Sequence, residues 1–128
     1  MREINGMKVG IMGIVDSQYV STCWFEDEKV VLENEVTKAQ NMVNFFEENN
    51  CDLIIALTHI LNDHDCKLLQ KVKGIDISLG GHEHCYFVKK YQDNLCIKSG
   101  SNFESFNVVE ISLSEEKIQN DKTNDHYL

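Results

Sequence analysis

The sequence predicts an α/β fold: a mainly parallel strand–helix–strand–helix–strand unit, followed by an antiparallel hairpin and a further strand. The segment 52–58, DLIIALT, is a continuous apolar run, which is typical of a parallel strand covered on both faces. The segment 33–49 carries apolar residues at steps of three and four, the spacing of one helix face. With 128 residues and a hydrophobic fraction of 42%, the chain can form one domain with a real core.

The first long strand is expected at 7–15. Asn5-Gly6 before it is typical of a hairpin turn. Gly10 and Gly13 within it indicate a strand that other backbone approaches closely. Residues 16–32 show no regular pattern, and the helix at 33–49 follows, with an apolar stripe formed by Val36, Ala39, Val43 and Phe46.

A second, shorter helix is expected after the strand at 52–58. Asn62 or Asp63 can cap its first turn, and Gly74 is placed to end it. A short strand at 75–79 follows. The apolar positions of this helix are Leu68, Leu69 and Val72.

The pattern then changes to that of a hairpin. Segments 86–91 and 95–98 flank the polar turn Gln92-Asp93-Asn94. A further strand is expected at 103–113, with Phe106, Val108 and Ile111 as its more buried residues. Residues 114–128 are polar and charged, so we expect a domain at 1–113 and a polar tail or linker at 114–128.

Charge and composition exclude several classes of protein. Twelve Lys and Arg stand against 21 Asp and Glu, a formal net charge of −9. Such a chain is not expected to bind nucleic acid polymers or anionic membranes, both of which require basic surfaces. An anionic substrate would need a local cation, and a bound divalent metal would supply one.

The cysteines are five in number and form no C-x-x-C pair: Cys23, Cys51, Cys66, Cys85 and Cys96. An odd, scattered set favours reduced thiols over a disulfide framework or a zinc ribbon. This slightly favours the cytoplasm, and localisation is otherwise left open.

Three histidines form the candidate metal site. His59 directly follows the strand at 52–58, and His82 closely follows the strand at 75–79. Ligands of open parallel sheets bind beyond the carboxyl ends of the strands, so the two side chains are expected in one crevice. His84 lies two residues further on and can share the same face. Gly80 and Gly81 allow a sharp turn and a close ligand, and three imidazoles suit zinc, iron or manganese.

Neighbouring polar residues have simpler interpretations. Glu83 alternates away from the histidines and is expected to be solvated, and His64 and His126 are expected at the surface. Asp65 has two interpretations. It either orients a ligand histidine by a hydrogen bond or is an acidic residue favoured in the first turn of a helix.

The segment 57–84, LTHILNDHDCKLLQKVKGIDISLGGHEH, resembles the second half of the calcineurin-like metallophosphoesterase domain, in its 5′-nucleotidase branch. The matching features are a strand ending in Thr-His, an acid six residues later, a leucine-rich helix, G-I-D and G-G-H-x-H. The opening INGMKVGIMGIVD is similar to the preceding strand of that family, and the resemblance spans residues 4–113. It implies a metallophosphoesterase-type α/β sandwich.

The resemblance implies a two-metal phosphoesterase acting on a small-molecule phosphoester. In that family His59 and His82 would bind one metal ion and His84 the other. Ser99, Gly100 and Ser101 fall where the family has a loop near the substrate.

The early family motifs D-x-H, G-D and G-N-H are missing from these 128 residues. They supply the carboxylate ligands that two cations require. We therefore expect an incomplete fragment that binds at most one metal ion and is inactive alone. Its sheet should leave an apolar face uncovered, which favours self-association or pairing with the missing N-terminal half.

Two other hypotheses remain open. The chain could be a metal-binding or interaction module that kept the fold without catalysis. It could also be a different α/β hydrolase with Cys85 or a serine as nucleophile, although no G-x-S-x-G sequence is present.

Overall fold

A computed structural model describes residues 1–15, 31 and 33–112, and the statements below concern these residues. The expected irregular segment 16–32 and the expected tail 114–128 lie almost entirely outside them. The elements are β1 (Arg2–Ile4), β2 (Met7–Val15), α2 (Glu35–Glu48), β3 (Leu53–His59), α3 (Asn62–Lys71), β4 (Ile77–Gly80), β5 (Tyr86–Tyr91) and β6 (Asn94–Ser99).

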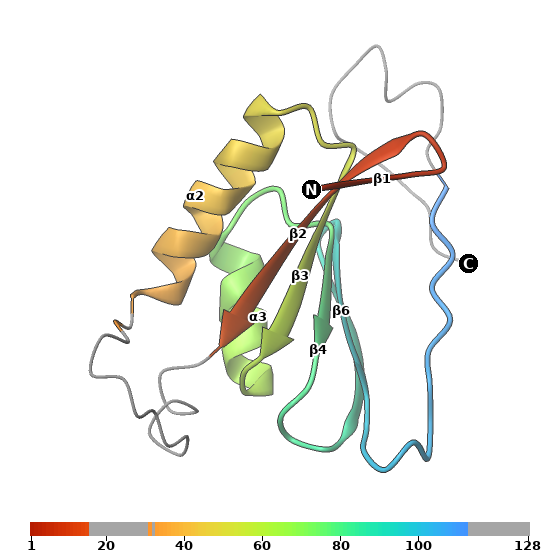
Figure 1. Cartoon of the computed structure of the whole chain (residues 1–128). Coiled ribbons are helices and arrows are strands. Elements are labelled where there is room, and N and C mark those ends of the chain that lie inside the picture. The colour runs from red at the N-terminus through yellow and green to blue at the C-terminus, as the bar shows by residue number, and fades with distance from the viewer. Residues whose placement is uncertain (16–30, 32, 113–128) are drawn as a thin grey trace.

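The strands form one six-stranded sheet in the order β1-β2-β3-β4-β6-β5 (Figure 1). The four central strands β2, β3, β4 and β6 are parallel, and the edge strands β1 and β5 are antiparallel to their neighbours. This confirms the mainly parallel unit and the hairpin. Because the central strands are parallel, their carboxyl ends lie along one edge of the sheet.

The first helix packs on the sheet by the predicted stripe. Ala39, Val43 and Phe46 of α2 are buried, as the spacing of three and four residues requires. Gly10 of β2 lies directly beneath Phe46, because a Cβ atom at Gly10 would lie 2.6 Å from Cγ of that ring. The prediction that backbone approaches Gly10 and Gly13 was wrong. A side chain fills the space above Gly10, and no described residue lies within 4 Å of a Cβ at Gly13.

The N-terminus of α3 differs from its prediction. Leu61 occupies the cap position and makes no side-chain capping bond, so neither Asn62 nor Asp63 is the cap. The backbone N–H of Asn62 instead donates to Oε2 of Glu83, at 2.7 Å, from a loop 21 residues away. The Glu83 carboxylate therefore accepts a hydrogen bond from the first turn of α3, a role usually filled by the side chain of a local cap residue.

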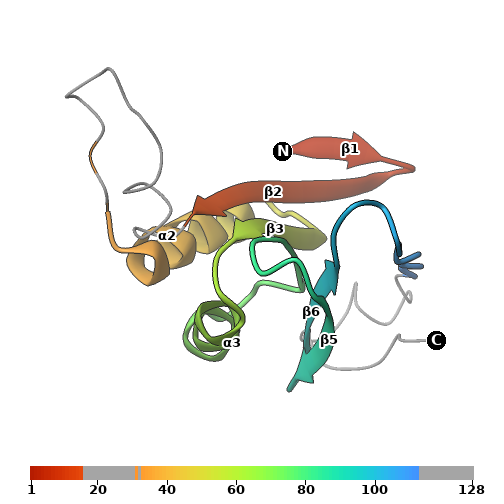
Figure 2. The ribbon, with the colours of Figure 1, turned by 90° about the horizontal axis from the view of Figure 1, so that it is seen from below.

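Both described helices lie on the same face of the sheet (Figure 2). The other face presents apolar side chains, and Ile11, Leu57 and Leu79 are 39%, 48% and 36% exposed. The prediction that the strand at 52–58 is covered on both faces was therefore wrong for its second half. The expected uncovered apolar face is confirmed within the described residues, since Leu57 and Leu79 are register partners on it.

The expected further strand is not formed by residues 103–112, which pair with no other strand in the described structure. Phe106 and Val108 are 72% and 84% exposed rather than buried. The segment passes on the side of the sheet away from the helices (Figure 2). A β-strand requires backbone hydrogen bonds to a neighbouring strand, and residues 103–112 form none with the described strands.

No helix among the described residues is long and apolar enough to cross a membrane. The four described cysteines, Cys51, Cys66, Cys85 and Cys96, are free thiols.

Candidate functional site

Two of the predicted histidines meet at the carboxyl edge of the sheet. The ring centroids of His59, at the end of β3, and His82, just beyond β4, lie 5.1 Å apart, with an angle of 75° between the ring planes. The backbone N–H of Gly81 donates to the carbonyl oxygen of Thr58 at 3.0 Å, which ties the two strand ends together. Residues distant in sequence are therefore adjacent because their strands are parallel neighbours.

The loop that carries His82 and His84 has unusual backbone angles. His82 has a φ of 96° and His84 a φ of 54°, which place both in the left-handed region. A non-glycine residue there is strained and persists only when its surroundings hold it. Gly80 and Gly81 do not have positive φ angles, so the turn falls on the histidines rather than on the glycines.

Gly80 is required by close packing instead. A Cβ atom there would lie 2.8 Å from Cε of Lys98 and 2.8 Å from Oγ1 of Thr58. A Cβ at Gly81 would meet only Nδ1 of His59, at an ordinary contact distance of 3.5 Å.

A buried ion pair lies beneath this loop. The ammonium group of Lys98 is 2.9 Å from Oδ2 of Asp65, and the two side chains are 2% and 0% exposed. Oδ1 of Asp65 accepts hydrogen bonds from the hydroxyl groups of Thr58, at 2.7 Å, and Ser78, at 3.0 Å. The carboxylate thus fixes the residue that precedes His59. Its predicted role of orienting a ligand histidine directly stays a prediction.

Glu83 is an exposed residue, as alternation predicted, but its side chain also contacts the body of the domain. Its carboxylate accepts the Asn62 backbone N–H and also lies 3.3 Å from the ammonium group of Lys98. Alternation did not predict these contacts, because the left-handed residues on both sides of Glu83 break the extended backbone.

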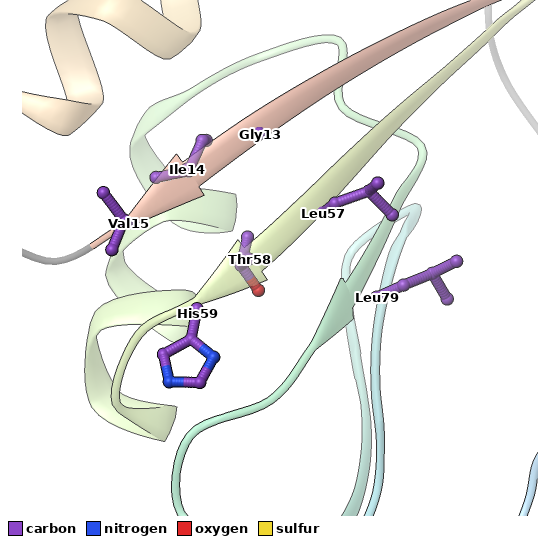
Figure 3. Close-up of a pocket in the computed structure, with 7 residues that line it drawn as sticks. All are labelled: Gly13, Ile14, Val15, Leu57, Thr58, His59 and Leu79. Atoms are coloured by element: carbon purple, nitrogen blue, oxygen red, sulfur yellow. The ribbon is translucent and has the colours of Figure 1, made fainter. Parts of the chain in front are cut away.

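A shallow hollow of about 370 Å³ adjoins His59 on the open face of the sheet. It is lined by Gly13, Ile14, Val15, Leu57, Thr58, His59 and Leu79 (Figure 3). Leu57 and Leu79 project to the same side, and His59 lies at the end of β3 (Figure 3). The open apolar face therefore extends to the histidine pair.

The loop at Ser99, Gly100 and Ser101 lies close to the end of the histidine loop. Gly100 has a φ of 84°, and a Cβ there would lie 3.7 Å from the backbone nitrogen of Tyr86. The Ser99 hydroxyl accepts a hydrogen bond from the side-chain amide of Asn107 at 2.8 Å, and the Ser99 carbonyl oxygen accepts one from Ser105. This placement suits the predicted substrate loop, whose role stays untested.

The sequence is similar to those of known nucleotide-hydrolysing proteins. The trifunctional nucleotide phosphoesterase protein YfkN of Bacillus subtilis (strain 168) is 37% identical over 83 residues, covering 64% of this chain and 6% of that protein. A 5′-nucleotidase of Diplobatis ommata is 30% identical over 84 residues, covering 66% of this chain and 14% of that protein. Over part of its length the chain is therefore similar in sequence to 5′-nucleotidase-type phosphoesterases.

A solved structure also shares the fold. The NAD nucleotidase NadN of Haemophilus influenzae superposes with a TM-score of 0.65 and 18% identity, covering 77% of this chain and 24% of that one. A comparison with models of known protein families finds no match. The chain thus spans a small part of the phosphoesterases that it resembles.

Two of the three predicted metal ligands lie next to each other among the described residues. His59 and His82 are adjacent, as two ligands of one ion would be. Within residues 1–15, 31 and 33–112, no group of three or more His, Cys, Asp or Glu is arranged to hold a metal ion. The donors among the described residues therefore do not make up a complete two-metal site, and His84 stays a predicted ligand.

Sequence reasoning missed Lys98 as a residue of the site. The available signal was its position directly after the apolar run Leu95–Ile97, which suggests burial. A buried lysine is almost always paired with an acidic residue, so a partner would also have been expected. Its partner could not be inferred from spacing, because Asp65 lies on a helix of a different segment.

Proposed function

We propose that this chain supplies the histidine part of a metal-dependent phosphoester hydrolase of 5′-nucleotidase type. The substrate of the complete site would be a nucleotide or a related phosphomonoester. The observation that carries this proposal is the contact of His59 and His82 at the carboxyl edge of the parallel sheet. The similarity to a nucleotide phosphoesterase and to a 5′-nucleotidase supports the choice of substrate class.

Each predicted residue has a role in this proposal. His59 and His82 bind one divalent ion, of zinc, manganese or iron, and His84 binds the second ion of the complete site. Such ions, when bound, polarise the phosphoryl oxygens and lower the pKa of water. Asp65 holds the strand end beside His59 through its hydrogen bond from Thr58. Ser99, Gly100 and Ser101 form the loop next to the bound phosphoester.

The chain alone is proposed to bind at most one ion and not to catalyse hydrolysis. Neutral imidazoles leave the charge of two dications uncompensated, and a bridging carboxylate is needed to hold the ions together. The chain covers 6% and 14% of the length of the two curated relatives named above. The missing carboxylates would come from the rest of such a catalytic domain.

The partner of the open face is proposed to be that remaining part of the catalytic domain. Ile11, Leu57 and Leu79 expose an apolar surface that adjoins His59, so a partner covering it would reach the metal site. Pairing of two copies of this chain is the competing outcome, and sedimentation of the isolated chain distinguishes a monomer from a dimer.

Metal retention tests the proposed ligands. The chain is purified, loaded with zinc or manganese, desalted and analysed for metal, alongside His59→Ala, His82→Ala and the control His64→Ala. We expect metal in the parent chain and in His64→Ala, and loss of it in the other two variants. Equal retention in all four proteins would reject His59 and His82 as ligands.

Phosphate release tests the activity. The chain is incubated with a nucleoside 5′-monophosphate and manganese, and free phosphate is compared with a metal-only blank. We expect no release by the chain alone, and release when a polypeptide carrying D-x-H, G-D and G-N-H motifs restores the domain. A restored domain that binds metal and releases no phosphate would favour the non-catalytic metal-binding module instead.

A further inference from the structure

Lys98 is a buried cation placed between the two chain segments that carry the histidines. Besides its ion pair with Asp65, its ammonium group donates to the carbonyl oxygen of Ile60 at 2.7 Å. It also donates to Oε2 of Glu83 at 3.3 Å. Ile60 follows His59 directly, and Glu83 lies between His82 and His84, so one ammonium group contacts both segments.

A contribution to stability alone does not explain why a lysine is buried at position 98. Removing an ammonium group from water is costly, and a buried ion pair is often no more stabilising than well-packed apolar residues of the same volume. Cys96, two residues earlier on β6, is fully buried, so the lysine continues a side of the strand that faces the core. The packing is also specialised for the lysine, because a Cβ at position 80 would collide with its Cε atom. These features indicate a role in fixing a particular arrangement.

The arrangement that needs fixing is the strained loop. His82 and His84 both have positive φ angles, and the side chain of the intervening Glu83 is anchored to the body of the domain. One Glu83 contact is the first N–H of α3 and the other is Lys98. Loss of either contact would let the loop relax toward extended backbone and move the ring of His82 away from His59.

We infer that Lys98 is a positioning residue, which holds His59 and His82 in contact through the Ile60 carbonyl oxygen and the Glu83 carboxylate. The purpose of this positioning, which is to preorganise two metal ligands, rests on the proposed function. The geometric claim itself concerns the metal-free chain and can be tested without a metal.

Ring contacts in the metal-free chain provide the first test. Nuclear Overhauser effects between the ring protons of His59 and His82 are measured in the parent chain and its variants. Lys98→Met combined with Asp65→Asn removes both buried charges together, which avoids an unpaired buried carboxylate. Glu83→Ala removes a side chain that is 29% exposed, so this variant should fold more readily. It provides the test if the double variant does not fold.

We expect the ring contact to persist in the parent chain and in the control Lys67→Met, whose lysine is exposed on α3. We expect it to be lost in the double variant and in Glu83→Ala, and restored in Glu83→Gln, which keeps an acceptor oxygen at the same length. An unchanged ring contact in Glu83→Ala or in the folded double variant would overturn the inference.

Zinc affinity provides the second test. Residues that orient metal ligands typically change affinity by about 10–100-fold when removed, and we expect a loss of that size in the double variant and in Glu83→Ala. Equal zinc affinity of these variants and the parent chain would overturn the inference. A parent chain that binds no zinc would instead reject the proposed metal site, and the ring contacts would still decide the role of Lys98.

Discussion

Substituting each glycine of the Gly80-Gly81 pair by alanine should have opposite effects on stability. Gly80→Ala places a Cβ atom 2.8 Å from both Cε of Lys98 and Oγ1 of Thr58, and 3.2 Å from Oδ2 of Asp65. Optimal contacts between heavy atoms are about 3.5–4.0 Å. The lysine cannot move aside freely, because its ammonium group is held by Asp65 and by the Ile60 carbonyl oxygen.

The magnitude follows from two opposing terms. Overpacking of a buried site costs about 1–3 kcal/mol, while replacing glycine by alanine at a compatible backbone stabilises by about 0.4–1 kcal/mol through the unfolded chain. Gly81→Ala meets only Nδ1 of His59, at 3.5 Å, and neither glycine has a positive φ angle. The free energy of unfolding of Gly80→Ala should therefore fall below that of Gly81→Ala by about 1–3 kcal/mol.

Urea unfolding followed by circular dichroism measures this difference. With a denaturant slope of about 1–3 kcal/mol per molar, the midpoint of Gly80→Ala should be lower by on the order of 1 M. Gly81→Ala is the matched control, since it changes the same residue type one position away. Equal midpoints for the two variants would refute the argument that a crowded Lys98 makes glycine necessary at position 80.

Three further predictions concern other parts of the domain. Leu57→Glu should change the free energy of unfolding by less than about 0.5 kcal/mol, because the side chain is half exposed, and should abolish any dimer seen by sedimentation. Burial raises the pKa of the Cys96 thiol from 9.0 to about 12, so Cys96 should resist alkylation at pH 8 in the folded chain while the exposed Cys85 reacts. Because the thiolate is disfavoured in the folded state, the contribution of Cys96 to the free energy of unfolding is complete below pH 9.0 and is lost as the pH rises toward about 12. The free energy of unfolding of Cys96→Ala should therefore decrease less over this alkaline range than that of the parent chain. Asn34→Ala should cost about 1 kcal/mol, measured by urea unfolding, because its side chain accepts the Thr37 N–H at the start of α2.

The sequence was sufficient to predict the features that depend on local periodicity and chain order. The stripe of Ala39, Val43 and Phe46 follows from helical spacing alone. The convergence of His59 and His82 follows from the parallel arrangement of β3 and β4, which brings their carboxyl ends to one edge. These predictions required no knowledge of tertiary packing.

Other features could not be predicted because they depend on what lies opposite in space. Leu57 belongs to an apolar run, and such a run does not indicate whether the second face of the strand is covered or open. The contacts of Glu83 could not be predicted because alternation assumes extended backbone, and the flanking histidines have positive φ angles. The contact of Lys98 with the Ile60 carbonyl oxygen joins residues 38 positions apart, with no local signal for the pairing.

Counting the imidazole ligands of a bound zinc ion tests the central claim most directly. X-ray absorption of the zinc-loaded chain distinguishes imidazole nitrogens, at about 2.0–2.1 Å, from other ligands. We predict two imidazoles in the parent chain and fewer in both His59→Ala and His82→Ala, with no change in His64→Ala. A zinc ion bound with the same ligand number in His59→Ala and His82→Ala would contradict a metal site built from the two strand ends.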